Sequence, residues 1–244
     1  MRIVRDAFSV LAQLLVFPQT CCLCGRPVLN AQWIPLCNEC LSSLPRLSVA
    51  LCPICGMPAD GQCSRCRLSP PPFSCARAYG PYQGRLRDLI WCYKFRGSQR
   101  LSYALSELME TAYKEHFLDR SLDLLIPVPS HPKRINKRGF DHVGRLTKSL
   151  SEALKLPCFR GLRRDRDTQP LFGLDTHERV QNLKGAFSLS DPEALAGKNV
   201  LLVDDVMTTG TTIRQVSRLL RNQSSVDRID VLTVARVPRF LGIQ

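Results

Sequence analysis

The chain has 244 residues, of which 44% are hydrophobic and 23% charged, and its formal net charge is +13. This composition is close to that of an ordinary globular protein, so it argues against disorder, collagen or coiled coil as the dominant structure, and the length suits one large or two small domains. The basic excess favours polyanionic partners such as nucleic acids, nucleotides or phosphate esters, and no apolar run reaches the roughly 18 residues of a membrane span.

The first 17 residues are predicted to form an amphipathic helix that packs on the rest of the protein. Arg2 and Arg5 precede an apolar stretch, as in a signal peptide. However, Asp6 abuts that stretch, and no small-residue cleavage site follows before Pro18. We therefore expect a cytoplasmic protein rather than an exported one.

Cysteines dominate the next segment, because nine of the twelve in the chain fall between residues 21 and 66. Eight of these form C-x-x-C pairs, and two such pairs supply the four thiolates of a tetrahedral zinc site. A disulfide framework needs an oxidising compartment, so the regular spacing favours zinc, about two ions per chain. Cys22 does not fit the spacing, and a crossed pairing of the four knuckles stays open. The predicted ligands are Cys21, Cys24, Cys37 and Cys40 for one ion, and Cys52, Cys55, Cys63 and Cys66 for the other.

A proline-rich joint follows at residues 69–75, since a run of prolines continues neither helix nor sheet. It predicts two domains, a helix and zinc module over residues 1–75 and a second domain over residues 76–244. Residues 76–97 give no clear secondary structure.

Aromatic and basic residues alternate within this unclear stretch. Such a pattern is typical of a surface that binds single-stranded nucleic acid. The favoured alternative is a helix that packs on a sheet. The residues concerned are Trp91, Tyr93, Lys94 and Phe95.

Strands and helices then alternate along the chain. The predicted helices are residues 101–116, 143–154 and 210–221, and the predicted strands are residues 123–129, 199–204 and 229–236. This alternation predicts an α/β fold with a parallel sheet that helices cover on both faces. Ligands of such sheets bind at the carboxyl ends of the strands.

A basic cluster follows the strand predicted at residues 123–129. Lys133, Arg134, Lys137 and Arg138 lie close together in a predicted loop. Such a cluster neutralises a pyrophosphate, with arginine offering a bidentate fork. The alternative is a solvated basic surface or a nucleic-acid patch.

The sharpest chemical pattern is at residues 200–212, VLLVDDVMTTGTT, in which an apolar strand runs into two acids, a turn and a helix. Backbone N–H groups at such a turn bind phosphate, and glycine permits close backbone approach. The two acids are placed to accept hydrogen bonds from sugar hydroxyls or to hold Mg²⁺ through water. The alternative is an ordinary strand end with a threonine-rich cap, which leaves two costly acids without a role. The predicted binding residues are Asp204, Asp205, Thr208, Thr209, Gly210, Thr211 and Thr212.

This stretch resembles the phosphoribosyl-pyrophosphate signature of type I phosphoribosyltransferases, and the whole chain resembles the ComF/GntX family of bacterial proteins linked to DNA uptake or gluconate use. LIWCYKFRG, IPVPSHPKRINKRGFDH and TQPLFGLDTHERVQNLKGAF are similar to stretches of that family. The resemblance implies a type I phosphoribosyltransferase-like domain behind a double zinc ribbon. It also implies that Asp204 and Asp205 contact the ribose hydroxyls and that residues 208–212 hold the 5′-phosphate. A pyrophosphate loop is implied at Val128, Pro129 and Ser130, continuing to Arg134, Lys137 and Arg138.

The polar segment at residues 159–185 resembles the flexible lid that closes over substrate in such enzymes. The alternative is a disordered charged loop. His131, His142 and His177 lack the mutual spacing of metal ligands, so each is expected to be a lone surface histidine.

The sequence predicts one of two functions. The first is a phosphoribosyltransferase-type protein that binds phosphoribosyl pyrophosphate or a nucleotide with Mg²⁺ and transfers the phosphoribosyl group to a nitrogen base. The alternative is a non-catalytic protein that senses a nucleotide and contacts single-stranded DNA or DNA-uptake proteins. Neither the acceptor base nor a catalytic general base follows from the sequence.

Overall fold

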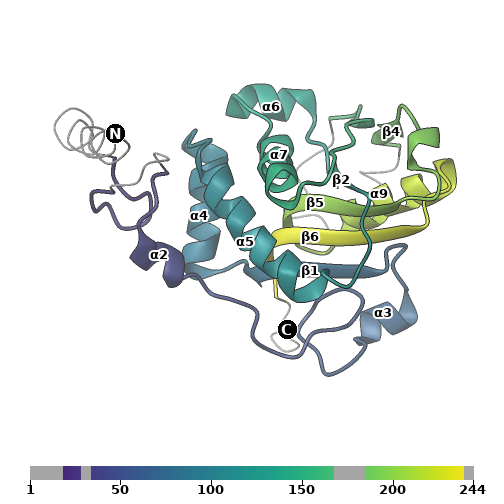
Figure 1. The fold of residues 1–244 in the computed structure, drawn as a ribbon, viewed down its shortest axis with the longest axis horizontal. Helices are drawn as coiled ribbons and strands as arrows, with labels where there is room; N and C mark the ends of the chain where they lie inside the picture. Colours follow the sequence, from purple (N-terminus) through teal and green to yellow (C-terminus); the bar gives the residue numbers. More distant parts are fainter. Residues whose placement is uncertain (1–18, 29–33, 168–184, 239–244) are drawn as a thin grey trace.

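A four-stranded parallel sheet forms the centre of the molecule (Figure 1). This computed structural model describes residues 19–28, 34–167 and 185–238, so the predicted N-terminal helix and most of the predicted lid lie outside the described residues. The strand order is β1-β6-β5-β2, and every neighbouring pair is parallel. The strands are β1 (Cys75–Pro81), β2 (Leu124–Pro127), β5 (Asn199–Met207) and β6 (Arg228–Arg236).

The sheet is parallel because helices connect its strands and cover both of its faces, which lets the strands be apolar on both sides. In β5, Leu201 and Val203 join one hydrophobic cluster, whereas Val200 and Leu202 join the other. This alternation follows from the two-residue period of a strand. The predicted α/β fold with a parallel sheet is confirmed.

Three long helices cover one face, and a single long helix covers part of the other. The first three are α4 (Gly84–Phe95), α5 (Leu101–His116) and α7 (His142–Leu154), and their apolar residues share one cluster. The opposite face carries α9 (Thr211–Gln223), the hairpin of β3 (Leu162–Arg164) and β4 (Phe187–Leu189), and a 3₁₀ turn at Glu193–Leu195. Among the described residues, no helix is both long and apolar enough to cross a bilayer.

The structure confirms the three predicted helices and the three predicted strands within a few residues of their bounds. Residues 76–97, which gave no prediction, form most of β1 and all of α4. The strand expected to end at residue 204 instead continues to Met207, because β6 pairs with it as far as Arg236. Both acids of residues 200–212 therefore belong to the strand itself.

The basic cluster was predicted to lie in a loop, and this prediction is wrong. Residues Pro132–Arg138 form the helix α6. Pro132 occupies the first turn, where its missing N–H costs nothing, and the His131 side chain caps the helix by accepting from the Lys133 N–H. Gly139 ends the helix at a left-handed φ of 82°.

The two cysteine ribbons pack on different parts of the molecule. The first contains α2 (Asn38–Ser42) and shares a hydrophobic cluster with α4 and α5. The second contains α3 (Ser64–Leu68) and packs with residues of the sheet and of α9. Figure 1 shows α2 beside α4 and α3 below β1, far from α2. The predicted domain boundary at residue 75 stays a prediction.

Candidate functional site

The carboxyl ends of β2 and β5 open into a polar cavity of about 390 Å³. The end of β5 and the residues that follow β2 contribute to its wall, together with the start of α9, α6, the start of α7, the end of α4 and the end of β3. The lining residues are Tyr82, Lys94, Val128, Pro129, Ser130, Arg134, Arg138, His142, Val143, Arg164, Asp204, Asp205, Val206, Thr208 and Thr212. Residues that sequence reasoning singled out in two separate stretches, 128–138 and 204–212, therefore meet in one cavity.

Asp205 is the most tightly held acid of the cavity. Its Oδ2 lies 2.7 Å from Nζ of Lys94 and 2.7 Å from Nε2 of His142. All three side chains are buried or nearly so, with 7%, 15% and 5% of their surface exposed. Burial by itself would raise the pKa of Asp205, but the charges of Lys94 and His142 outweigh it and hold the pKa far below its usual range.

Asp204 lies in a different electrostatic environment. Burial, reinforced by the negative charge of Asp205, raises the pKa of Asp204 to about 8. Its Oδ1 accepts a 2.9 Å hydrogen bond from the Asp205 backbone N–H. Adjacent acids with opposite pKa shifts are typical of functional sites. The Asp204 carboxyl therefore loses its proton and becomes negatively charged when a cation or a hydrogen-bond donor enters the cavity.

His142 and Lys94 are functional candidates that sequence reasoning missed. His142 was expected at the surface, but only 4% of it is exposed, and His131 is also buried. Nε2 of His142 lies 2.7 Å from Oδ2 of Asp205, and Nη1 of Arg138 lies 3.1 Å from Nδ1 and 3.2 Å from Nε2 of the same ring. The Tyr93 hydroxyl donates to the His142 carbonyl at 2.6 Å and fixes its backbone. His177 lies outside the described residues.

The helix interpretation of the aromatic and basic stretch explains Lys94. Tyr93 of α4 is fully buried, and the next residue, Lys94, reaches Asp205 near the end of β5. Phe95 and Trp91 remain exposed on the outer side of the same helix. The sequence could predict that Lys94 lies on a helix beside a sheet, but not that it forms an ion pair with an acid on a strand distant in sequence.

The threonine-rich turn, residues 208–212, joins β5 to α9. Gly210 is the N-cap of α9 and has a left-handed φ of 74°, where a Cβ would come within 2.6 Å of the Met207 side chain. Thr208 and Thr212 line the cavity. Thr209 and Thr211 do not, because their buried hydroxyls lie 2.8 Å apart and bond to each other. The free N–H groups at the start of α9 suit an anion.

The arginines of the site come from two elements. Arg134 and Arg138 of α6 and Arg164 of β3 line the main cavity. Burial, together with the charge of Arg134, lowers the pKa of Arg164 to about 10. Lys137 lies instead in an adjoining cavity of about 270 Å³, formed with Lys94, Phe95, Arg134 and Arg138.

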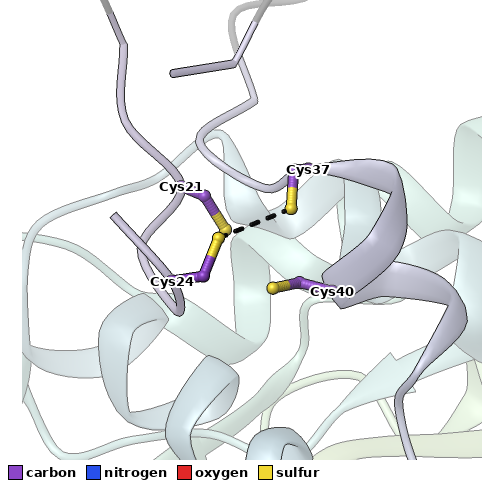
Figure 2. A group of neighbouring side chains, drawn as sticks. All are labelled: Cys21, Cys24, Cys37 and Cys40. Carbon is purple, nitrogen blue, oxygen red and sulfur yellow. Dashed lines mark hydrogen bonds between the residues drawn. The ribbon is translucent and has the colours of Figure 1, made fainter. Parts of the chain in front are cut away.

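Two Cys₄ clusters lie apart from this cavity, and the sequential pairing of the knuckles is confirmed. The four sulfurs of each cluster lie within 4.8 Å of one another, and Cys22 belongs to neither. Figure 2 shows the four side chains of the first cluster converging. The Sγ atoms of Cys24 and Cys37, and those of Cys55 and Cys63, are 3.7 Å apart. Tetrahedral zinc with bonds of about 2.3 Å needs sulfurs about 3.8 Å apart.

The first cysteine of each cluster has the same local structure. The N–H of Cys21 donates to the Arg26 carbonyl at 2.7 Å, and the N–H of Cys52 donates to the Met57 carbonyl at 2.7 Å. Burial raises the pKa of both thiols, but hydrogen bonds from neighbouring backbone groups outweigh it and lower each pKa to about 6. Both thiols are therefore prepared to bind metal as thiolates.

Comparison with known families agrees with this architecture. A double zinc ribbon domain matches residues 12–69, and a phosphoribosyl transferase domain matches residues 134–239. Among solved structures, the chain resembles a B. subtilis glutamine phosphoribosylpyrophosphate amidotransferase, with 20% identity, a TM-score of 0.36, and coverage of 58% of this chain and 26% of that one. It also resembles an adenine phosphoribosyltransferase, with 16% identity, a TM-score of 0.39, and coverage of 56% and 70%.

Relatives extend over most of the chain. DNA utilization protein YhgH of Escherichia coli strain K12 is 33% identical over 214 residues, which cover 85% of this chain and 92% of the relative. Competence protein F of Haemophilus influenzae is 32% identical over 209 residues, covering 82% and 90%. Competence protein ComFC of Bacillus subtilis is 23% identical over 215 residues, covering 82% and 84%. Since this chain matches both domain models and is 33% and 32% identical to the first two relatives over most of its length, it belongs to the ComF family.

Proposed function

We propose that the main cavity binds phosphoribosyl pyrophosphate and that the protein transfers its phosphoribosyl group to a nitrogen base. The observation that carries the proposal is the arrangement of charge in one cavity. Two adjacent acids lie beside the N-terminus of α9, and the arginines of α6 and β3 line the same cavity. A sugar with a phosphate at one end and a pyrophosphate at the other matches this arrangement.

Each group of residues has a role in this proposal. The threonine-rich turn binds the 5′-phosphate through backbone N–H groups and the hydroxyls of Thr208 and Thr212. Asp204 accepts from a ribose hydroxyl or from water on Mg²⁺. Asp205 is oriented by Lys94 and His142 and offers its second oxygen to the sugar. Residues 128–130, together with Arg134 and Arg138, bind the pyrophosphate.

The reaction needs charge stabilisation more than proton transfer. The bond between C1 and the pyrophosphate oxygen breaks, and pyrophosphate leaves with the electron pair. A bond forms between C1 and the nitrogen of the base, which releases its proton to solvent. Mg²⁺ held near Asp204 supplies charge to neutralise the departing pyrophosphate. The arginines of α6 and β3, which line the same cavity, also stabilise that charge.

Two measurements test the proposal. Titration calorimetry with phosphoribosyl pyrophosphate and Mg²⁺ should show one site per chain, and Asp204→Asn should weaken it about tenfold or more, since a charged hydrogen bond contributes about 1.5–3 kcal/mol. A screen of nitrogen bases should then reveal one that triggers pyrophosphate release. Binding without release on any base would favour nucleotide sensing over catalysis.

A second function, binding of single-stranded DNA, is favoured by a surface on α4. Trp91 and Phe95 are 47% and 57% exposed, and their rings lie 5.9 Å apart. Arg96 lies over the Trp91 ring at 5.3 Å, and Arg138 lies over the Phe95 ring at 5.4 Å. Exposed aromatic rings among cations stack bases and neutralise phosphates. The names of the relatives, which refer to DNA utilization and competence, agree with such a partner.

This second function has its own test. Trp91→Ala with Phe95→Ala should weaken binding of a fluorescent oligothymidine about tenfold or more, because each stacked base contributes about 1–3 kcal/mol. Affinity should also fall steeply with salt. Tyr103→Ala is the matched control, because Tyr103 is 44% exposed on α5 and outside the surface described. Equal losses in the double variant and the control would exclude the α4 surface.

A further inference from the structure

A second cavity adjoins the first at Thr208 and has no role in the function proposed so far. Its volume is about 490 Å³, and it lies between the second cysteine ribbon and the carboxyl end of β6. Thr208 lines both cavities. The residues that line this second cavity are Met57, Pro58, Ala59, Asp60, Gln62, Cys63, Ser64, Arg65, Arg67, Thr208 and Arg236.

Arg236 is the unusual member of this wall. It ends β6 opposite Met207 of β5, and only 4% of its surface is exposed. Its Nε and Nη1 are fully buried and have no hydrogen-bond partner among the described residues. A buried guanidinium with unpartnered N–H groups costs free energy, so its retention in the cavity wall is favoured by negative charge close to it.

The rest of the wall indicates what ligand the cavity suits. Arg65 and Arg67 bring further N–H donors to the wall beside Arg236, whereas negative charge comes from Asp60 and, with zinc bound, from the cluster that includes Cys63. Guanidinium N–H groups suit the oxygens of a carboxylate or phosphate. Met57, Pro58 and Ala59 provide an adjacent apolar surface on which a flat ring can lie.

The wall is also held in place, as a binding site requires. Arg214 donates to the carbonyl oxygen of Ser69 at 2.9 Å, which ties the end of the second ribbon to α9. The Ala76 N–H donates to the Ile54 carbonyl at 2.7 Å, which ties the ribbon to β1. A Cβ on Gly56 would lie 2.4 Å from the Ala76 carbonyl oxygen, so ribbon and strand are in close contact.

We infer that this second cavity binds the acceptor of the transfer reaction and that the acceptor is a flat nitrogen heterocycle carrying an acidic group, which pairs with Arg236. The inference rests on the proposed function for the reaction itself. The second ribbon then has a substrate-binding role besides binding zinc. Because Thr208 lines both cavities, the acceptor and the phosphoribosyl group are adjacent there.

The test compares ring pairs that differ only in charge. Calorimetry on the full zinc-loaded chain uses nicotinate against nicotinamide and orotate against uracil. At least one acid should bind about tenfold or more tightly than its neutral counterpart, the factor expected of a charged hydrogen bond. Arg236→Gln should abolish this preference, whereas Arg218→Gln should keep it, because Arg218 is exposed on α9 outside the cavity.

Arg236 also lies within electrostatic reach of Cys55, Cys63 and Cys66, so zinc is measured in every variant. The double variant Arg65→Gln with Arg67→Gln decides the matter if Arg236→Gln loses metal. A weakened preference for the acid in this double variant supports the inference, and an unchanged preference overturns it. Wild-type protein that prefers neither acid also overturns it.

Titration with phosphoribosyl pyrophosphate alone separates the two proposals. Protein that binds phosphoribosyl pyrophosphate but prefers neither acid overturns this inference and leaves the proposed function standing. Protein whose acid preference depends on Arg236, yet which does not bind phosphoribosyl pyrophosphate, supports the anion site and overturns the transfer reaction.

Discussion

His142, at the start of α7, and Asp205, near the end of β5, are joined by a 2.7 Å contact between Nε2 and Oδ2. Lys94 reaches the same oxygen from α4. Three elements that are distant in sequence are thereby fixed to one carboxylate. Asp204, although adjacent in sequence, takes no part in this contact and faces the cavity. Both acids line the cavity, but Asp205 also anchors two basic side chains, so it has a structural role in addition to its role in binding the ligand.

The two acids should respond differently to the same substitution. Asp205→Asn leaves Lys94 and His142 without their anion, and breaking a buried ion pair costs about 3–5 kcal/mol. Asp204→Asn removes no ion pair and should fold at least as well as the wild type. Both should weaken binding of phosphoribosyl pyrophosphate. Urea denaturation measures the difference in stability, and equal stability of the two variants would contradict these roles.

The raised pKa of Asp204 predicts a pH dependence of binding. Asp204 is protonated below its pKa of about 8, so affinity for Mg²⁺ and phosphoribosyl pyrophosphate should rise as the pH increases from 6.5 to about 8.5. Because the negative charge of Asp205 contributes to this shift, Asp205→Asn should move the midpoint to lower pH. Calorimetry across this range tests both statements. A flat profile in the wild type would show that Asp204 is already charged at neutral pH.

The same shift affects stability, with the opposite sign. The folded protein holds the Asp204 proton more tightly than the unfolded chain does, so this group disfavours folding progressively as the pH rises from about 4 to about 8. Asp204→Asn should therefore raise the Tm of the ligand-free protein at pH 8 but not at pH 4. Each kcal/mol gained corresponds to about 2–4 °C. Scanning calorimetry at both pH values measures the gain, and an equal effect at both would exclude the titration as its cause.

Gly210 should tolerate no β-branched residue. Its φ of 74° and the nearby Met207 side chain leave no room for a Cβ, so Gly210→Val should abolish phosphate binding and lower stability. Thr212→Val removes one hydroxyl that lines the cavity and should weaken binding only modestly. Thr209→Val removes a hydroxyl that bonds to Thr211 and should affect stability more than affinity. Similar affinities for all three variants would show that the phosphate binds elsewhere.

Sequence alone predicted the parts of the site that are local. The C-x-x-C spacing defines each zinc cluster, and residues 200–212 carry strand, acids, turn and helix within one short stretch. Hydrophobic periodicity likewise predicted α5 and β6, because the apolar residues of each follow one another along a single uninterrupted stretch of the sequence.

What the sequence could not predict depends on tertiary packing. Lys94 and His142 carry no motif, and only the placement of α4 and α7 on the sheet brings them to Asp205. The helix α6 was missed because its start, a proline after a histidine cap, reads as a loop. Arg236 ends an apolar strand, and its burial beside the second ribbon follows only from the fold.

The two zinc sites should differ in what they stabilise. Three ligands of the second cluster, Cys52, Cys55 and Cys66, are buried in the hydrophobic cluster shared with the sheet and α9. The first cluster has two buried ligands, Cys21 and Cys40, and an exposed one, Cys24. Cys52→Ser should therefore remove one zinc and lower the Tm of the whole chain by several degrees. Cys24→Ser should remove one zinc and mainly loosen the first ribbon, with little change in the main transition.

Elemental analysis and scanning calorimetry measure zinc content and Tm in the same preparations. The wild type should carry about two zinc ions per chain, because each Cys₄ cluster has the sulfur spacing of one tetrahedral ion. Cys22→Ser is the control and should keep both ions, because Cys22 lies outside both clusters. A chelator should unfold the sheet only when it removes the second ion, since metal binding supplies part of the folding free energy there. Metal-free protein with these cysteines in disulfides would overturn the zinc assignment.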